Sequence, residues 1–249
     1  IVIEDSNGNQ FVWIPTGTYQ TSSGEKTNNL SRRTFTSSGA TEVTADNGDG
    51  AIGGFYGEGN SHSVANTQIV AFKASAESVA NGGNGGFYIG RYEQGAGNVC
   101  KYNQTPYVYV TRDQAKSQAE AMYSGNNNVV SELISSYAWD TALNFICQTN
   151  AEGYTLATTT SSNYGNIATG TNVSYRKNTG VDVNDNYSKI HDLLGNCFEW
   201  TTEYCEASNY PWTFRGGAFH IDFCAADRAF LGTGGETTSF RLQLHIKSN

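Results

Sequence analysis

The segment DLLGNCFEWTTEY, residues 192–204, decides how this chain is interpreted. Gly195 and Asn196 are residues that tolerate positive φ, so they predict a tight turn. An acid–Trp pair follows the turn, at Glu199 and Trp200. Downstream come RGGAFHIDFCAADRAF, residues 215–230, and SFRLQL, residues 239–244. These pieces are too short to form a domain alone, so the rest of the chain must frame them.

Composition narrows the class of protein. The 249 residues contain only 15% charged residues but 28 Gly, 15 Tyr and 12 Phe, which favours a loop-rich α+β domain over a helical bundle. A single domain spanning residues 1–249 is expected. The formal net charge of −8 argues against nucleic acid as a partner. No apolar run reaches the length that a membrane span requires, so no membrane insertion is expected.

The chain begins on IVIEDSNGNQFVWIP with neither Met nor a signal peptide. We interpret it as a processed chain or a fragment of a longer protein.

Local patterns predict the elements. Residues 20–86 are rich in Ser, Thr, Gly and Asn and are interpreted as a polar, loop-rich insertion. Strands are predicted at 10–19, 67–74 and 85–93, from alternating or β-branched apolar residues. Two helices are predicted, at 112–123 and 131–148. For the first, Thr111 and Gln114 have the spacing of a capping box.

The cysteines suggest a reduced interior. They are five in number and include no C-x-x-C pair, which excludes a zinc ribbon and a thioredoxin-like motif. Buried thiols are the first interpretation. A disulfide between Cys197 and Cys205 is the alternative that remains open.

The order of the motifs is what resembles a known family. FYIGRYE, PYVYVTRDQAKSQAEAM, AWDTALNF, DLLGNCFEWT, FRGGAF, CAADR and SFRL follow one another as in the formylglycine-generating enzyme (sulfatase-modifying factor) family. The resemblance covers roughly residues 85–246 and implies an elaborated C-type-lectin-like fold with two helices and short irregular sheets. Trp139 and Trp200 would then be apolar anchors, and Arg215 and Arg241 would pair with buried carboxylates.

The copper chemistry of that family is not expected here. Its oxidases use two cysteines, separated by four residues, in the segment after R-G-G. Cys224 matches the second of them, whereas Phe219 stands at the first position and cannot ligate copper. A copper oxidase or a divergent metalloenzyme stays open as the alternative function. His220 and His245 could form a different metal site with Cys224; the other interpretation is that the two histidines are unrelated.

Calcium is the cofactor that the resemblance does imply. Asp192 and Glu199, with the carbonyl groups of Gly195 and Cys197, are similar to the family's calcium-binding turn, and oxygen ligands suit this ion. Asn166 could mark a second such site, with Asp182 or Asp185. The alternative is that Asp192 and Glu199 cap or pair locally.

The chain also resembles the variable proteins of diversity-generating retroelements, which include phage tropism determinants. The resemblance implies a changeable segment after the G-N-x-x-E-W turn, here 207–249, and a ligand-binding protein with no enzymatic activity. The expected partner is a protein or cell-surface receptor, and the expected location is a virion, a cell surface or the extracellular space. An oligomer is compatible with this interpretation. The expected ligand-binding residues are Ala218, Phe219, His220, Ile221, Phe223, Ala229 and Phe230, with Tyr210 and Trp212 beside them.

Overall fold

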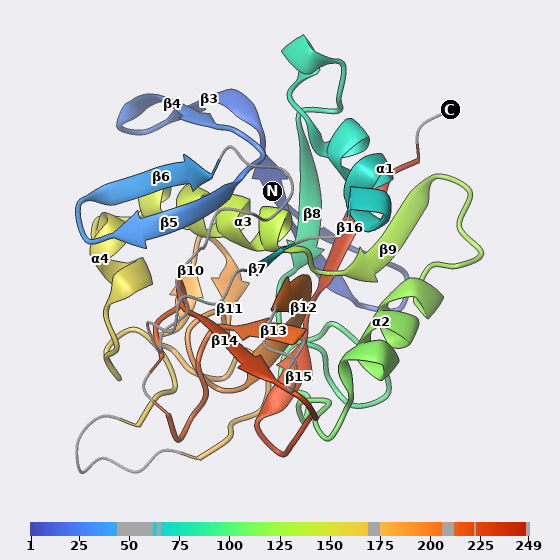
Figure 1. The fold of residues 1–249 in the computed structure, drawn as a ribbon, viewed down its shortest axis with the longest axis vertical. Helices are drawn as coiled ribbons and strands as arrows, with labels where there is room; N and C mark the ends of the chain where they lie inside the picture. The colour runs from blue at the N-terminus through green and yellow to red at the C-terminus, as the bar shows by residue number, and fades with distance from the viewer. Residues whose placement is uncertain (44–61, 64–65, 169–174, 206–211, 222, 248–249) are drawn as a thin grey trace.

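The computed structural model describes residues 1–43, 62–63, 66–168, 175–205, 212–221 and 223–247. Two sheets dominate the described chain (Figure 1). Sheet A is antiparallel throughout, with strand order β1-β2-β8-β16-β9. Its strands are β1 (Val2–Glu4), β2 (Gln10–Pro15), β8 (Gly86–Gly90), β9 (Val129–Leu133) and β16 (Leu242–Ile246).

Sheet B carries the motifs that decided the fold. Its strand order is β14-β13-β12-β15, with β7 also pairing with β12, and β15 is the parallel neighbour of β12. The strands are β7 (His62–Ser63), β12 (Phe198–Cys205), β13 (Trp212–Arg215), β14 (Arg228–Leu231) and β15 (Thr238–Phe240). Only Arg241 separates β15 from β16, so this residue joins the two sheets.

Helices and small hairpins surround the sheets. The helices are α1 (Asn66–Ala76), η1 (Val79–Asn81), α2 (Arg112–Ala121), α3 (Ser136–Thr149) and α4 (Gly153–Thr158). Helix α1 lies beside β16, and α2 lies beside β9 (Figure 1). The hairpins are β3 (Gly17–Thr21) with β4 (Gly24–Asn28), β5 (Arg32–Thr36) with β6 (Gly39–Val43), and β10 (Asn186–Tyr187) with β11 (Ile190–His191).

The α+β class is confirmed, and so is the capping box: the Thr111 hydroxyl accepts from the Gln114 amide, and the Gln114 side chain accepts from the Thr111 amide.

The strand prediction at 67–74 is wrong, because this stretch lies in α1. Ile69, Phe72 and Ala76 recur at helical spacing and are buried, whereas Val70 is 62% exposed. The β-branched Ile69–Val70 pair had suggested a strand, but packing against sheet A decides the structure.

The second predicted helix begins later than expected. Residues 129–133 form β9 and pair with β16, and α3 begins after Ser135. The Ser135 hydroxyl accepts from the Ala138 amide at 3.2 Å, as an N-cap does. The described chain has four α-helices rather than the two predicted.

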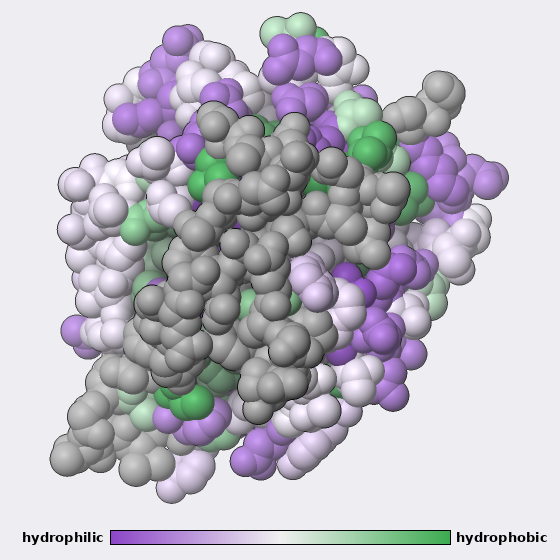
Figure 2. Space-filling view, viewed as in Figure 1, coloured by the Kyte–Doolittle hydropathy of each residue, from purple (hydrophilic) through white to green (hydrophobic). Residues whose placement is uncertain are grey.

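Two apolar clusters fill the interior, one around Trp139 and one around Trp200, and both indoles are fully buried. All five cysteines are buried thiols, as first interpreted, and Cys197 and Cys205 form no disulfide. On the face drawn in Figure 2 the described side chains are mostly hydrophilic, with hydrophobic residues scattered among them. Among the described residues, no helix combines the length and apolarity needed to cross a membrane.

Candidate functional site

The turn of residues 192–197 is locked to its neighbours by backbone and amide hydrogen bonds. Gly195 has φ 91° and Asn196 has φ 59°, as the sequence predicts. A Cβ on Gly195 would lie 2.5 Å from the Asn166 carbonyl oxygen, so only glycine fits there. The Gly195 amide donates to the Gly216 carbonyl at 2.6 Å. This bond connects the G-N turn directly to the R-G-G motif.

Asn196 connects the turn to other segments of the chain by hydrogen bonds. Its side-chain nitrogen donates to Glu93, and its side-chain oxygen accepts from the Lys177 amide at 2.8 Å. Its backbone carbonyl accepts from the Phe219 amide at 3.1 Å. The turn therefore holds the beginning of the candidate ligand-binding segment.

A buried network of three arginines and two carboxylates underlies that segment. Arg32 donates to Glu203 at 2.5 Å, Arg228 donates to Glu203 at 2.9 Å, and Arg215 donates to Asp140 at 2.8 Å. Arg228 also donates to Asp140. Every one of these side chains is at most 2% exposed. Charges this deeply buried are tolerated only because they are paired and hydrogen-bonded.

The sequence had pointed to Arg215 as a partner of buried carboxylates, and the network confirms it. Arg32 was missed. It lies in the polar stretch interpreted as a loop-rich insertion, and no local pattern distinguishes it from a solvated arginine.

The loop between β13 and β14 is fastened to this framework. The Trp139 indole donates to the Ala225 carbonyl at 3.0 Å, and the Ala226 amide donates to the Ala157 carbonyl at 3.0 Å. The Cys224 amide donates to the Asp227 carboxylate at 2.8 Å. A Cβ on Gly217 would lie 2.5 Å from the Phe223 carbonyl oxygen, so the loop closes tightly on itself. Its backbone is held by the core on both sides.

Only part of the expected ligand-binding set reaches the surface. His220 is exposed, and Phe219 and Ile221 are partly exposed. The Phe219 and His220 rings lie 5.0 Å apart. These three consecutive residues are called the 219–221 tip below.

Three expected ligand-binding residues are corrected to core positions. Ala218 is fully buried, Phe223 is 4% exposed and Ala229 is 2% exposed. Phe223 packs on Phe198 with ring centroids 5.3 Å apart. The cause is the turn itself: the bridge between Ala218 and Ile221 directs the tip outward while the residues on either side of it return to the core.

The other expected ligand-binding residues lie elsewhere. Trp212 is partly exposed at the far end of β13, where the Arg112 guanidinium stacks 4.1 Å above its ring. Tyr210 and the side chain of Phe230 lie outside the described residues, although the Phe230 backbone belongs to β14.

Cys224 is a buried thiol beside an acidic side chain. It is 8% exposed, and burial, together with the nearby Asp227 carboxylate, raises the pKa of its thiol to about 12. His245 packs on Phe72 near α1, whereas His220 is exposed on the tip. Within the described ranges, no group of three His, Cys, Asp or Glu side chains could hold a metal ion.

The expected calcium ligands fit the ion only in part. Glu199 is fully buried, and its two oxygens accept from the Arg241 guanidinium at 2.9 and 2.6 Å. That guanidinium already supplies the positive charge that calcium would bring. Asp192 accepts from the Gly180 amide at 2.5 Å, and burial raises the pKa of its carboxyl to about 7. The geometry around Glu199 therefore favours the local-pairing alternative for this carboxylate.

Asn166, which marks the suggested second calcium site, is anchored by hydrogen bonds from its side-chain nitrogen, an atom that would not bind calcium. The Asn166 side chain donates to the Tyr175 carbonyl and to the Asn196 side chain, at 2.9 Å each. Asp185 lies in the interior, where burial raises its pKa well above the usual value.

Comparison with solved structures identifies the fold. PvdO from Pseudomonas aeruginosa matches with a TM-score of 0.55 and 12% identity, covering 98% of both chains. CarF matches with a TM-score of 0.49 and 13% identity, over 66% of this chain and 87% of its own. Treponema denticola variable protein 1 matches with a TM-score of 0.49 and 10% identity, over 98% of both chains. No family model and no curated protein matches the chain.

The similarity to PvdO concerns the fold alone, because identity is low. It agrees with the motif order and with the observed sheets. The chain has the C-type-lectin-like fold of the formylglycine-generating-enzyme type.

Proposed function

We propose that this chain is a non-catalytic ligand-binding protein that presents the 219–221 tip to a protein or cell-surface receptor. It would act on a virion, a cell surface or in the extracellular space. In this proposal the tip belongs to a segment diversified by a retroelement, in a phage or a bacterium.

The observation that carries the proposal is the contrast between a fixed backbone and displayed side chains. The loop is held from beneath by the Trp139 indole and the Ala157 carbonyl, and at the start of the tip by the Asn196 carbonyl. Between these attachments the tip exposes the His220 imidazole beside part of the Phe219 ring, and part of the Ile221 side chain, which also packs against the cluster around Trp200. Changing these side chains would leave the attachments intact, because all of these bonds use backbone atoms of the loop.

The chemistry of the tip suits recognition of a macromolecule. Aromatic residues on a rigid support supply contact area at a low cost in conformational entropy. His220 adds a polar group that can donate or accept a hydrogen bond. Such a surface needs no reacting group.

Two features support a binding role over the copper oxidase. Phe219 occupies the position of the first family cysteine, and it offers no ligand atom. The remaining thiol, Cys224, is 8% exposed, and burial raises its pKa to about 12, which disfavours the free thiolate that nucleophilic chemistry needs.

The test is a binding screen with matched variants. Purified protein is screened against arrays of surface proteins and glycans, and a hit is then measured with the triple variant Phe219→Ser, His220→Ser, Ile221→Ser. We expect at least a tenfold loss of affinity with only a modest fall in melting temperature, since Phe219 and Ile221 are partly buried. Tyr102→Ser is the control, since Tyr102 is 55% exposed outside the tip.

Two outcomes contradict the proposal. One is full binding by the triple variant. The other is tight, stoichiometric copper(I) binding with oxygen consumption that is lost in Cys224→Ser, which would restore the oxidase. A reverse transcriptase gene and a near-repeat of the C-terminal coding segment beside this gene would support diversification.

A further inference from the structure

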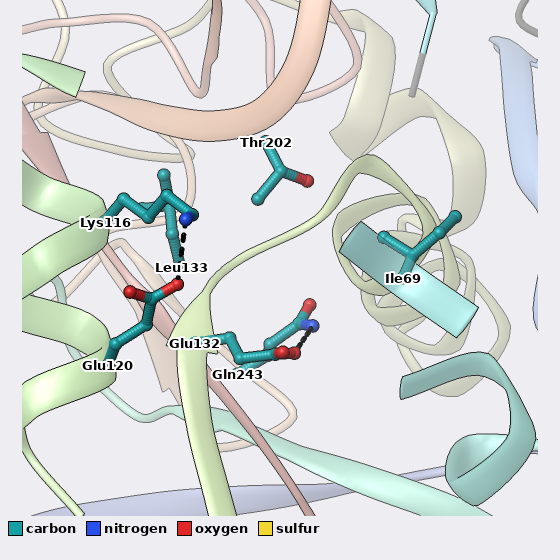
Figure 3. Close-up of a pocket in the computed structure, with 7 residues that line it drawn as sticks. All are labelled: Ile69, Lys116, Glu120, Glu132, Leu133, Thr202 and Gln243. Atoms are coloured by element: carbon teal, nitrogen blue, oxygen red, sulfur yellow. Dashed lines mark hydrogen bonds and ion pairs between the residues drawn. The ribbon is translucent and has the colours of Figure 1, made fainter. Parts of the chain in front are cut away.

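A separate cavity lies between α2 and β9. It has a volume of about 280 Å³, far more than the roughly 10–15 Å³ that one water molecule needs. We call it the α2–β9 cavity. Figure 3 shows the ion pair of α2 on one side, Ile69 on the other, Thr202 above and the Glu132–Gln243 pair below. The lining residues are Ile69, Lys116, Glu120, Glu132, Leu133, Thr202 and Gln243.

The charges lining this cavity leave one carboxylate without a counterion. Lys116 pairs with Glu120 at 3.1 Å, so these two charges offset each other. Glu132 accepts one hydrogen bond, from the Gln243 amide at 3.0 Å. His245 lies 3.6 Å from Glu132 but is neutral near pH 7, because burial lowers its pKa to about 4. Among the described lining residues, Glu132 is therefore the carboxylate without a matching cation. Burial raises its pKa, so a cation bound beside it would stabilise the ionised form.

A second polar group faces the cavity without a partner. The Thr202 hydroxyl is buried and makes no hydrogen bond with the described residues, and Thr202 is only 8% exposed. Gln243 cannot serve it, since the Gln243 side-chain oxygen already accepts twice from Ser135 at 2.8 Å. An unpartnered buried hydroxyl is costly, and a ligand that donates a hydrogen bond would remove that cost.

The walls beside these two polar groups are apolar. Leu133 is 1% exposed and Ile69 is 1% exposed, and the aliphatic stem of Lys116 adds further hydrocarbon surface. A ligand that fits must therefore combine a donor-rich cationic end with a short hydrocarbon body.

We propose that the α2–β9 cavity binds a short aliphatic primary amine. The ammonium group donates to the Glu132 carboxylate, and the alkyl chain contacts the apolar wall of Ile69 and Leu133. An ammonium has three donors and no acceptor, which suits the Glu132 carboxylate and leaves donors for water in the cavity. The same chemistry is offered by a free alkylamine and by a lysine side chain.

Calorimetric titration with n-butylamine tests the proposal, with n-butanol as an uncharged probe of equal chain length. Binding is expected for the amine with Kd near or below about 1 mM, and at least tenfold weaker binding for the alcohol. Nα-acetyl-lysinamide distinguishes the two sources. If it binds with an affinity comparable to that of n-butylamine, the natural ligand is a lysine side chain of a partner. If it does not bind, because its backbone does not fit at the cavity, the ligand is a free amine.

Three variants make the test specific. Glu132→Gln keeps the shape and should weaken amine binding at least tenfold, because it removes a charge-assisted hydrogen bond. Lys116→Gln should instead strengthen binding several-fold, since it frees the Glu120 carboxylate. Glu25→Gln is the control for an exposed glutamate outside the cavity and should change nothing.

Three results would overturn the proposal: equal affinity for amine and alcohol, unchanged amine affinity in Glu132→Gln, or no amine binding up to about ten times the expected Kd. These variants do not touch the 219–221 tip. A failure here is therefore distinguishable from a failure of receptor binding.

Discussion

Two phenylalanines, four residues apart in the same loop, should respond very differently to truncation. Phe223 is 4% exposed and stacks against Phe198, whereas Phe219 is partly exposed on the tip. Replacing a buried phenylalanine by alanine removes its apolar burial and leaves a cavity, which costs about 3–5 kcal/mol. We expect that cost for Phe223→Ala and about 1 kcal/mol for Phe219→Ala, which loses only part of a ring's burial.

The assay is urea unfolding followed by tryptophan fluorescence, since the buried indoles of Trp139 and Trp200 report on the core. Single domains commonly unfold with only about 5–15 kcal/mol, so Phe223→Ala should shift the midpoint strongly. His220→Ala is the control for an exposed position and should stay within about 0.5 kcal/mol of wild type. If Phe219→Ala costs as much as Phe223→Ala, Phe219 belongs to the core, and the proposal that the tip presents it to a receptor is refuted.

Further predictions concern the buried charges and the thiols. Glu203→Gln should cost about 3–5 kcal/mol in urea unfolding because it removes a buried negative charge that pairs with Arg32 and Arg228. Glu42→Gln, on a pair whose carboxylate is 42% exposed, should cost under about 1 kcal/mol; equal costs would contradict the network. Burial lowers the pKa of His245 to about 4 from 6.5, so the stability it contributes is present above pH 6.5 and is lost as pH falls towards 4. Relative to His245→Leu, the wild type should therefore lose about 2 kcal/mol between pH 7.5 and pH 5, and a constant difference would contradict this. Thiol reagents should leave all five buried cysteines unmodified until the chain unfolds, and rapid labelling of native protein would refute the assignment.

Local signals predicted those features that depend on a few neighbouring residues. The capping box at Thr111 follows from sequence spacing, because a cap bonds within one helical turn. The positive φ of Gly195 and Asn196 follows from residue type. The motif order correctly indicated the fold class.

Other assignments needed the tertiary structure. The segment 67–74 has β-branched residues, yet it is helical. In a helix Ile69, Phe72 and Ala76 lie on one face, and packing against sheet A buries that face. Residues 131–133 carry no signal that separates them from α3, and pairing with β16 makes them a strand. Long-range contacts of this kind are invisible to a local pattern.

For the candidate site, too, some features follow from the sequence and others from the tertiary structure. The sequence by itself indicated the fold class, through a G-N turn followed by an R-G-G motif. Only the tertiary structure decided that Phe223 lies in the core while His220 is exposed, and that Arg32 reaches Glu203 across the chain. The physical reason is that burial and ion pairing depend on which distant segments meet, and residue type and spacing along one segment do not carry that information.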